Sequence, residues 1–425
     1  MVIKRKSLVL ITLMLVGEAI FFLPFLIPRV FRPTFLTAFG IDNLELGTAF
    51  STYGIVAMVS YFLGGPFADR YSPKKLLIFS LLTTAGAGFL LATIPSTTTL
   101  ILLYGFWGFS TILLFWAAYI KGIRKFGGEL SQGKSQGLVD GGRGAAAAVI
   151  ASTSVLLIDI FLPVSSTEAS QEEISRAFSL IIIFFSGIVT LTALLAWRTL
   201  PDDSNDTPSI SKFSLIGIKK AVKHRSVWLQ ATILLCAYVG YKCVDDFGLY
   251  AQDTFGYDDV ESAHLATISF WMRPIGAALA GYLGDKFIHS KITSYCFLIL
   301  ILGAFILSSG ILSGSILLFV VMTLASLSLG IYGLRGLYYA LFQESKIPLS
   351  YAGAAIGFIS VIGYTPDIFM GPLMGVLLDN NPGPLGHRYL FGVLVGFGLL
   401  GFLASLLFRR TVTKQLSDFS EQNII

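Results

Sequence analysis

Long apolar stretches alternate with short polar segments along the whole chain. Crossing the hydrocarbon of a bilayer takes about 20 mostly apolar residues per helix. Twelve stretches meet this requirement, and they lie at about 8–36, 45–67, 76–95, 99–120, 136–162, 178–197, 227–251, 260–283, 292–312, 315–342, 352–378 and 389–408. Each exceeds the 9–11 residues of a spanning strand and lacks strict alternation, so we predict helices rather than the strands of a barrel.

Composition and charge placement indicate an integral membrane protein. Hydrophobic residues make up 54% of the chain and charged residues 13%, against roughly 25% charged in soluble domains. With the N-terminus inside, twenty-two Lys and Arg lie in cytoplasmic segments, two (Arg176 and Arg388) lie in opposite loops, and six lie within spans. The positive-inside rule then predicts an inner-membrane protein with cytoplasmic termini. The net charge of +5 reflects this topology, and we expect no nucleic-acid partner.

One short pattern occurs twice at a fixed distance. Gly65-Pro-Phe-Ala-Asp69-Arg70 is followed 216 residues later by Gly281-Tyr-Leu-Gly-Asp285-Lys286, and Asp42 and Asp258 share the same spacing. Internal duplication in an apolar chain is typical of secondary transporters. The pattern predicts two pseudosymmetric six-helix bundles, at 1–197 and 227–408, joined by a polar cytoplasmic linker (198–226) and followed by a cytoplasmic tail (409–425).

The segment Gly65-Pro-Phe-Ala-Asp69-Arg70-Tyr-Ser-Pro-Lys-Lys75 resembles the signature loop between helices 2 and 3 of the major facilitator superfamily. The segment from Gly281 to Lys291 resembles its weaker copy between helices 8 and 9. Ser72 and Pro73 depart from the pattern, which more often has Gly and Arg there. The resemblance covers essentially the whole chain and implies two bundles that rock around a central cavity.

The same loop residues are therefore candidates for gating. Glycine allows helices to approach closely, and Asp69 can face the positive N-terminal end of a helix from the other bundle. An ordinary solvated loop charge is the alternative. The gating candidates of the two copies are Gly65, Asp69, Arg70, Gly281, Asp285 and Lys286.

A second resemblance concerns the organophosphate:phosphate antiporter branch. The Gly-rich segment from Trp116 to Gly144, together with Arg29 late in the first helix, is similar to that branch, whose first and seventh helices carry arginines for phosphate. The position paired with Arg29 by the 216-residue spacing is Asp245, which departs from that pattern and argues against a phosphate ester.

Charged side chains inside the spans cost roughly 2.5–3.5 kcal/mol each at a helix centre and mark functional candidates. Six are basic and five acidic, so most of them can be paired. For several, a purely structural role as buried ion pairs that fix helix register is the alternative. The eleven are Glu18, Arg29, Arg32, Asp140, Arg143, Lys242, Asp245, Asp246, Arg273, Arg335 and Asp367. A rise of about 1.5 Å per residue, counted from the start of each span, predicts the depth of each charge in the membrane. By depth they fall into a midplane group (Glu18, Arg273, Asp367), an outer group (Arg29, Arg32, Lys242, Asp245, Asp246) and an inner group (Asp140, Arg143, Arg335).

The outer and inner groups are candidate gates. Arg29 and Asp245 occupy pseudosymmetric positions, so an ion pair between them can close the outer mouth. On the inner side Arg335 can be set against Asp140, or Arg143 can neutralise Asp140 one turn away. Lys242 and Asp246 can form an i,i+4 pair within one helix.

The midplane group is where a solute should bind. Arg273, beside Trp271 and Pro274, offers an anion anchor next to aromatic surface. Further substrate contacts are expected from Arg29, Lys242 and Arg335. Glu18 and Asp367 are candidates for proton coupling, since a carboxylate in a low-dielectric cavity favours its protonated form. Either is alternatively the permanent counter-ion of Arg273.

These observations predict a monomeric secondary transporter that moves a small polar, anionic or zwitterionic solute by alternating access, driven by a proton or an exchanged anion. A multidrug or metabolite exporter and a transporter-like receptor are alternatives. No catalytic constellation, Walker pattern or metal-ligand spacing occurs, so neither an enzyme nor a cofactor is expected. The three cysteines lie within spans.

Overall fold

The computed structural model describes residues 2–126, 132–161, 169–201, 215–312, 314, 317–338, 340–345 and 347–422. Every regular element within these residues is a helix, so the prediction of an all-α chain is confirmed. Some side chains inside the helices also fall outside the description, among them those of Gly65, Asp69 and Asp140.

The first expected span is not one continuous helix. Prolines 24, 28 and 33 lack the amide hydrogen that an α-helix needs, and the span is divided by a π-helical segment, η1. A second π-helical segment, η2, follows α6. In chain order the elements up to residue 199 are α1 (Val2–Ala19), η1 (Phe22–Leu26), α2 (Ile27–Val30), α3 (Arg32–Phe39), α4 (Asn43–Arg70), α5 (Pro73–Leu91), α6 (Thr97–Gly108), η2 (Phe109–Trp116), α7 (Ala117–Phe126), α8 (Gln132–Phe161) and α9 (Gln171–Thr199).

The second half contains a 3-10 turn, η3, that interrupts the seventh expected span, and a break near residue 364 that interrupts the eleventh. Its elements are α10 (Leu215–Ala221), α11 (Arg225–Cys243), η3 (Val244–Asp246), α12 (Phe247–Phe255), α13 (Asp259–Lys286), α14 (His289–Ser309), α15 (Leu317–Leu337), α16 (Leu341–Glu344), α17 (Leu349–Gly363), α18 (Pro366–Asn380) and α19 (Pro384–Gln422).

Helix ends repeat at the spacing found in the sequence. Helices α4 and α13 begin 216 residues apart and end 216 residues apart, and α5 and α14 begin at the same offset. Both copies of the turn before these long helices use the same local chemistry. Gly40 and Gly256 adopt positive φ angles of 60° and 70°, which glycine tolerates without strain.

The caps of the two long helices are also alike. Asp42 Oδ1 accepts the Glu45 amide at 2.7 Å and Asp258 Oδ1 accepts the Glu261 amide at 2.8 Å. In each case the glutamate accepts the amide of the capping aspartate, which completes a reciprocal capping box. The duplication is thus present in local structure as well as in sequence.

Nine helical runs among the described residues are long and apolar enough to cross a membrane, or ten if the bent pair Ser7–Ala19 and Phe22–Val30 counts as one span. The two other expected spans are α4 and α13, which have 28 residues each. At 1.5 Å per residue each is about 42 Å long, which is sufficient to span. The count is consistent with twelve helices.

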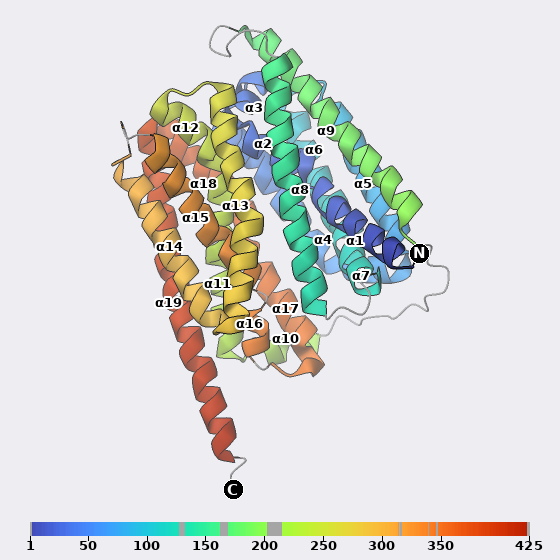
Figure 1. Ribbon diagram of the computed structural model, residues 1–425, viewed down its shortest axis with the longest axis vertical. Coiled ribbons are helices and arrows are strands. Elements are labelled where there is room, and N and C mark those ends of the chain that lie inside the picture. Colours follow the sequence, from blue (N-terminus) through green and yellow to red (C-terminus); the bar gives the residue numbers. More distant parts are fainter. Residues whose placement is uncertain are drawn as a thin grey trace. The chain divides into compact units, whose positions relative to one another are not determined.

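The chain forms two compact units. Unit 1 contains residues 1–211, 244–274 and 367–386, and unit 2 contains residues 212–243, 275–366 and 387–425. In unit 1, α1 packs against α8 and α9, while α5 packs against α9 and α4 against α6 (Figure 1). In unit 2, α14 packs against α15, and α17 packs against α10 and α11.

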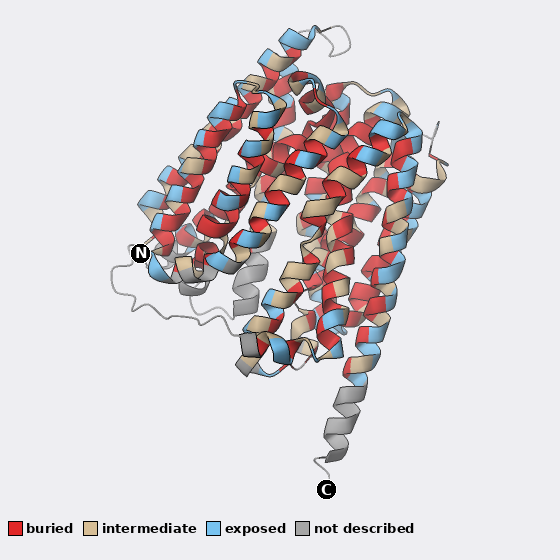
Figure 2. Cartoon of the chain, turned by 180° about the vertical axis from the view of Figure 1, so that it is seen from behind, coloured by how far each residue is buried: buried red, intermediate tan, exposed pale blue. Residues whose placement is uncertain are grey.

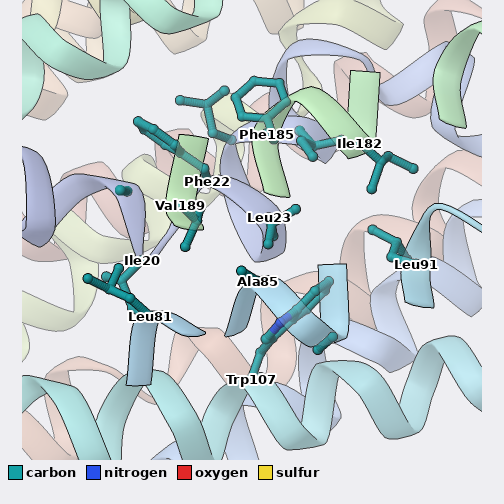
Figure 3. Close-up of a cluster of buried hydrophobic side chains, with 14 of the residues drawn as sticks. Ile20, Phe22, Leu23, Leu81, Ala85, Leu91, Trp107, Ile182, Phe185 and Val189 are labelled. Atoms are coloured by element: carbon teal, nitrogen blue, oxygen red, sulfur yellow. The ribbon is translucent and has the colours of Figure 1, made fainter. Parts of the chain in front are cut away.

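A large apolar core holds unit 1 together. Figure 3 shows part of it around Trp107 of α6, with Leu81 of α5 nearby and the rings of Phe22 and Phe185 close to each other. The two phenylalanine rings lie 5.7 Å apart in an edge-to-face arrangement, which aromatic pairs prefer.

The outward face of the helices is apolar as well. Along α9 the buried and exposed residues alternate around the helix (Figure 2), and large hydrophobic side chains such as Ile183, Leu191 and Trp197 are exposed. A helix with an apolar core side and an apolar exposed side is suited to lipid. The protein is therefore a multi-pass membrane protein.

Candidate functional site

Glu18 lies at the end of α1 between two arginines of unit 1. Its Oε1 accepts a hydrogen bond from Arg273 Nη1 at 2.6 Å, and its Oε2 accepts from Arg273 Nη2 at 3.1 Å and from Arg143 Nε at 3.1 Å. The three residues, which we call the Glu18 cluster, are only 4–5% exposed. With all three ionised, the cluster carries a net charge of +1.

Small residues bring these helices together. A Cβ on Gly144 of α8 would lie 3.2 Å from the side chains of Arg273 and Pro274, so glycine allows α8 to approach α13 closely. A Cβ on Gly17 would overlap the ring of Tyr119, whose hydroxyl donates to the Leu13 carbonyl at 3.0 Å. Glycine beside Glu18 therefore permits α7 to pack onto α1.

Aromatic rings surround Arg143 in the Glu18 cluster. The guanidinium carbon lies 5.9 Å from the centre of the Phe21 ring and 5.8 Å from each of the Trp116 and Tyr119 rings. Cation–π attraction at these distances stabilises a buried arginine. Phe21 and Trp116 are half-buried, so part of each ring remains accessible.

Arg29 of α2 and Asp245 of η3 form a second buried ion pair. The Arg29 Nε donates to Asp245 Oδ1, and both residues are 3% exposed. The guanidinium also lies 5.9 Å from the centre of the Phe270 ring. The structure thus brings together the two residues that the 216-residue spacing relates. Lys242 and Asp246 are also buried.

A polar network that the sequence did not predict begins at the neighbouring Arg32. Arg32 donates to Asn43 Oδ1 from Nε at 3.1 Å and from Nη2 at 2.8 Å. Asp379, near the end of α18, accepts the Asn43 side-chain amide at 3.0 Å and the backbone amides of Asn43 and Leu44 at 3.2 and 2.8 Å. A carboxylate at this place satisfies amides that the first turn of α4 leaves free.

Helices α4 and α18 touch through glycines along the same side. A Cβ on Gly47 would overlap the Gly371 carbonyl, and one on Gly375 would overlap the backbone of Leu44. A Cβ on Gly54 would lie 2.6 Å from the Asp367 carbonyl oxygen. Backbones this close require small residues at the contact. The local signal, a Gly-x-x-x-Gly at 371–375, was present in the sequence, but its partner helix was not identifiable.

Asp367, the third expected midplane residue, lies in the first turn of α18 and is buried. The first turn of a helix favours a carboxylate. Of the two carboxylates considered for Arg273, Glu18 accepts hydrogen bonds from it in the structure.

The inner group of charges is only partly described. Arg143 donates to Glu18, and the Asp140 side chain lies outside the described residues, so the expected contacts of Asp140 stay predictions. Arg335 of α15 is half-buried, and its guanidinium lies 4.2 Å from the centre of the Tyr241 ring. This distance indicates stacking of the guanidinium on the ring.

The residues of the two loop motifs are only partly described. Gly65 and Asp69 have no described side-chain environment, and Arg70 is exposed at the end of α4. At Gly281, a Cβ would meet no described atom within 4 Å, so the expected close helix approach there stays a prediction. The glycine that is crowded is Gly284, where a Cβ would lie 2.7 Å from the His289 ring.

The second loop carries an acidic and histidine-containing cluster. Asp285 is exposed and lies 3.2 Å from His289 Nε2, while His289 Nδ1 lies 3.4 Å from Glu344 Oε1. Glu344 also accepts the Ser290 amide at 3.1 Å. Lys286 is exposed beside this cluster. These contacts join α14 to α16 within unit 2.

The chain belongs to the Major Facilitator Superfamily, a family of membrane transporters, whose sequence profile matches residues 9–369. It is similar to two inner membrane proteins of Escherichia coli strain K12. YqcE is 27% identical over 86% of this chain and 85% of YqcE. YihN is 25% identical over 98% of this chain and 99% of YihN.

Solved transporters have the same fold. A bacterial homologue of the human lysosomal transporter Spinster, in an inward-facing and unoccupied conformation, has a TM-score of 0.70 at 17% identity, over 96% of this chain and 98% of that one. A mutant form of the nucleoside transporter NupG has a TM-score of 0.72 at 13% identity, over 95% of this chain and 99% of that one. The predicted family and fold are thus confirmed.

Proposed function

We propose that the protein is a secondary active transporter that carries a small anionic or zwitterionic solute across the inner membrane by alternating access. The observation that supports this proposal is the Glu18 cluster, in which one carboxylate is shared by two buried guanidiniums. A site with a net positive charge inside a membrane protein attracts an anion and repels a cation. The class of exporter that uses a mostly apolar cavity with one acidic residue does not fit this arrangement.

Within this proposal Arg143 and Arg273 hold the anionic group of the solute. Arg29, Lys242 and Arg335 are further contacts for the solute in other conformations. Glu18 takes up and releases the coupling proton, with Asp367 as the second candidate; an exchanged anion is the alternative driving force. We further propose that the protein acts as a monomer and has cytoplasmic termini.

The same proposal includes an outer gate and a cytoplasmic gate. By the positive-inside rule the Asn43 end of α4 faces outward. The Arg29–Asp245 pair and the network of Arg32, Asn43 and Asp379 would then close the outer end in this conformation. The residues of the two loop motifs, together with Asp140, are the candidates on the cytoplasmic side.

Anion exchange in proteoliposomes tests the proposed function. Vesicles loaded with a panel of organic anions, amino acids and sugars should accumulate the matching labelled solute from outside only when the protein is present. Arg273→Gln should abolish this exchange, whereas Arg176→Gln, at an exposed position, should leave it intact. Binding or chemical conversion of a solute without exchange would instead indicate a receptor or an enzyme.

A cation or an apolar drug as the sole exchanged solute would overturn the proposed anionic substrate. Exchange by Arg273→Gln at the normal rate would overturn the assignment of the site, and the transport function would still stand.

A further inference from the structure

Glu18 binds Arg273 in the way that an oxyanion ligand would. Its two carboxylate oxygens accept two roughly parallel hydrogen bonds from Nη1 and Nη2 of one guanidinium, at 2.6 and 3.1 Å. This fork geometry is the preferred mode by which arginine recognises carboxylates. The second arginine, Arg143, adds a third bond to the same group. The cation pair thus already holds an anion supplied by the protein itself.

We propose that the Glu18 carboxylate is an internal substitute for the charged group of the substrate, and that the substrate displaces it from Arg143 and Arg273. This inference rests on the proposed transport function and adds to it the chemical class of the solute. The solute is an organic carboxylate, since a carboxylate reproduces the group that it replaces. In the empty carrier, Glu18 supplies negative charge to both buried guanidiniums, which reduces the cost of burying them.

The surroundings of Arg143 define the rest of the solute. Phe21 and Trp116 lie against its guanidinium and are only half-buried, so each ring retains surface that a ligand can cover. A carboxylate attached to a flat or apolar body would bind the arginines with its charged end and rest on these rings. A fully hydrated inorganic anion would make only the first of these contacts.

Displacement also links the solute to a proton. Among the described side chains, the groups that face Glu18 are Arg143 of α8, Arg273 of α13 and the neighbouring Tyr119 of α7. Helices α5 and α9, which also pack against α1, carry their charged residues only at their ends: Lys74, Lys75, Glu172, Glu173, Arg176 and Arg198.

A buried carboxylate that loses both guanidiniums is more stable with a proton. Before displacement, two arginines and one carboxylate give +1. After displacement, two arginines, one bound monoanion and a protonated Glu18 again give +1. One proton from solution therefore accompanies each monovalent anion, and the complex moves across the membrane without a change in its own charge.

Acetate tests the displacement directly. Replacing Glu18 with Ala retains Cβ and removes a CH₂–COO⁻ group, which is the size of acetate. The thermal midpoint of full-length Glu18→Ala protein should rise with acetate and saturate. The wild-type midpoint should respond only at much higher acetate concentrations, because Glu18 competes for the position. Acetamide, which has the same shape without the charge, should have no effect on either protein. Equal responses of the two proteins to acetate, or no response of Glu18→Ala, would overturn the proposal.

A second variant covers the case in which Glu18→Ala does not fold. Glu18→Gln keeps the shape and loses the competing charge, so benzoate should bind it about tenfold more tightly than wild type, a gain of about 1.4 kcal/mol. Benzamide serves as the neutral control. Benzoate affinity of the wild type should fall as pH rises, because each bound anion takes up one proton on displaced Glu18, and Glu18→Gln should lose this dependence.

Equal or weaker benzoate binding by Glu18→Gln, or an unchanged pH dependence, would overturn the displacement. Anion exchange by the wild-type protein would then still support the transport function. Failure of the wild-type protein to exchange any organic anion would count against the function itself, whatever the variants bind.

Discussion

The Arg29–Asp245 ion pair allows a quantitative test of the proposed outer gate. The Arg29 and Asp245 side chains are 3% and 4% exposed, so Arg29→Gln leaves the Asp245 carboxylate buried without its guanidinium. Breaking a buried pair by removing one partner costs about 3–5 kcal/mol. At about 1.36 kcal/mol per power of ten, the closed arrangement should become less populated by roughly two to almost four powers of ten relative to an open one in which Asp245 meets water.

Labelling of a buried position would measure this shift. Ser262 is fully buried, and its hydroxyl has no hydrogen-bond partner among the described residues, so Ser262→Cys is a nearly isosteric probe. The three native cysteines are buried and give a low background. We expect a membrane-impermeant maleimide to label Ser262→Cys much faster when Arg29→Gln is also present.

Two further variants make the result specific. The exposed pair of Arg176 and Glu172, 3.8 Å apart, should contribute at most about 1 kcal/mol, so Arg176→Gln should leave the labelling rate within a few fold. The charge exchange Arg29→Asp with Asp245→Arg should restore part of the slow rate. A labelling rate in Arg29→Gln that stays within twofold of the parent would refute the reasoning.

Four other substitutions have definite expected outcomes. Gly47→Ala forces a methyl group into the Gly371 carbonyl, so it should lower the thermal midpoint and the exchange rate. Gly86→Ala is the matched control, because a Cβ there meets no described atom within 4 Å. It should raise the midpoint slightly, since alanine favours helix over glycine by about 1 kcal/mol. Asp379→Ala removes the acceptor for the amides at the start of α4 and should cost about 0.5–2 kcal/mol of stability, measurable by denaturation; a loss below about 0.3 kcal/mol would argue against the cap. Arg335→Lys keeps the positive charge but loses the planar guanidinium that stacks on Tyr241. It should destabilise the protein by about 0.5–2 kcal/mol in the same denaturation assay. An unchanged midpoint would count against the stacking.

The sequence predicted best those features that follow from the duplication. Asp42 and Asp258 share its 216-residue spacing, and in the structure they cap α4 and α13 at matching positions in the two halves. The contact between Arg29 and Asp245 was also foreseeable, because their positions are related by the duplication.

Contacts that depend on how helices rotate and pack were less predictable. The sequence suggested Asp140, one turn away on the same helix, as one partner for Arg143, and gave no sign that the Arg143 guanidinium reaches Glu18 on α1. Hydropathy predicts how deep a charged residue lies in the membrane, but not which neighbouring helix its side chain faces. Likewise, nothing in the pattern around Gly281 distinguished it from the crowded Gly284 three residues later, because the crowding comes from how the chain packs around each position.

The π-helical segment η1 has a consequence for how the two ion pairs communicate. Glu18 lies near the end of α1, before this segment, and Arg29 lies in α2, directly after it. A π-helical turn holds one more residue than an α-helical turn. If η1 tightened into α-helix, the helix before it would turn by about 100° relative to the helix after it. Release of Glu18 from its arginines could then twist Arg29 away from Asp245, so that a bound anion at one end of η1 would open the pair at the other.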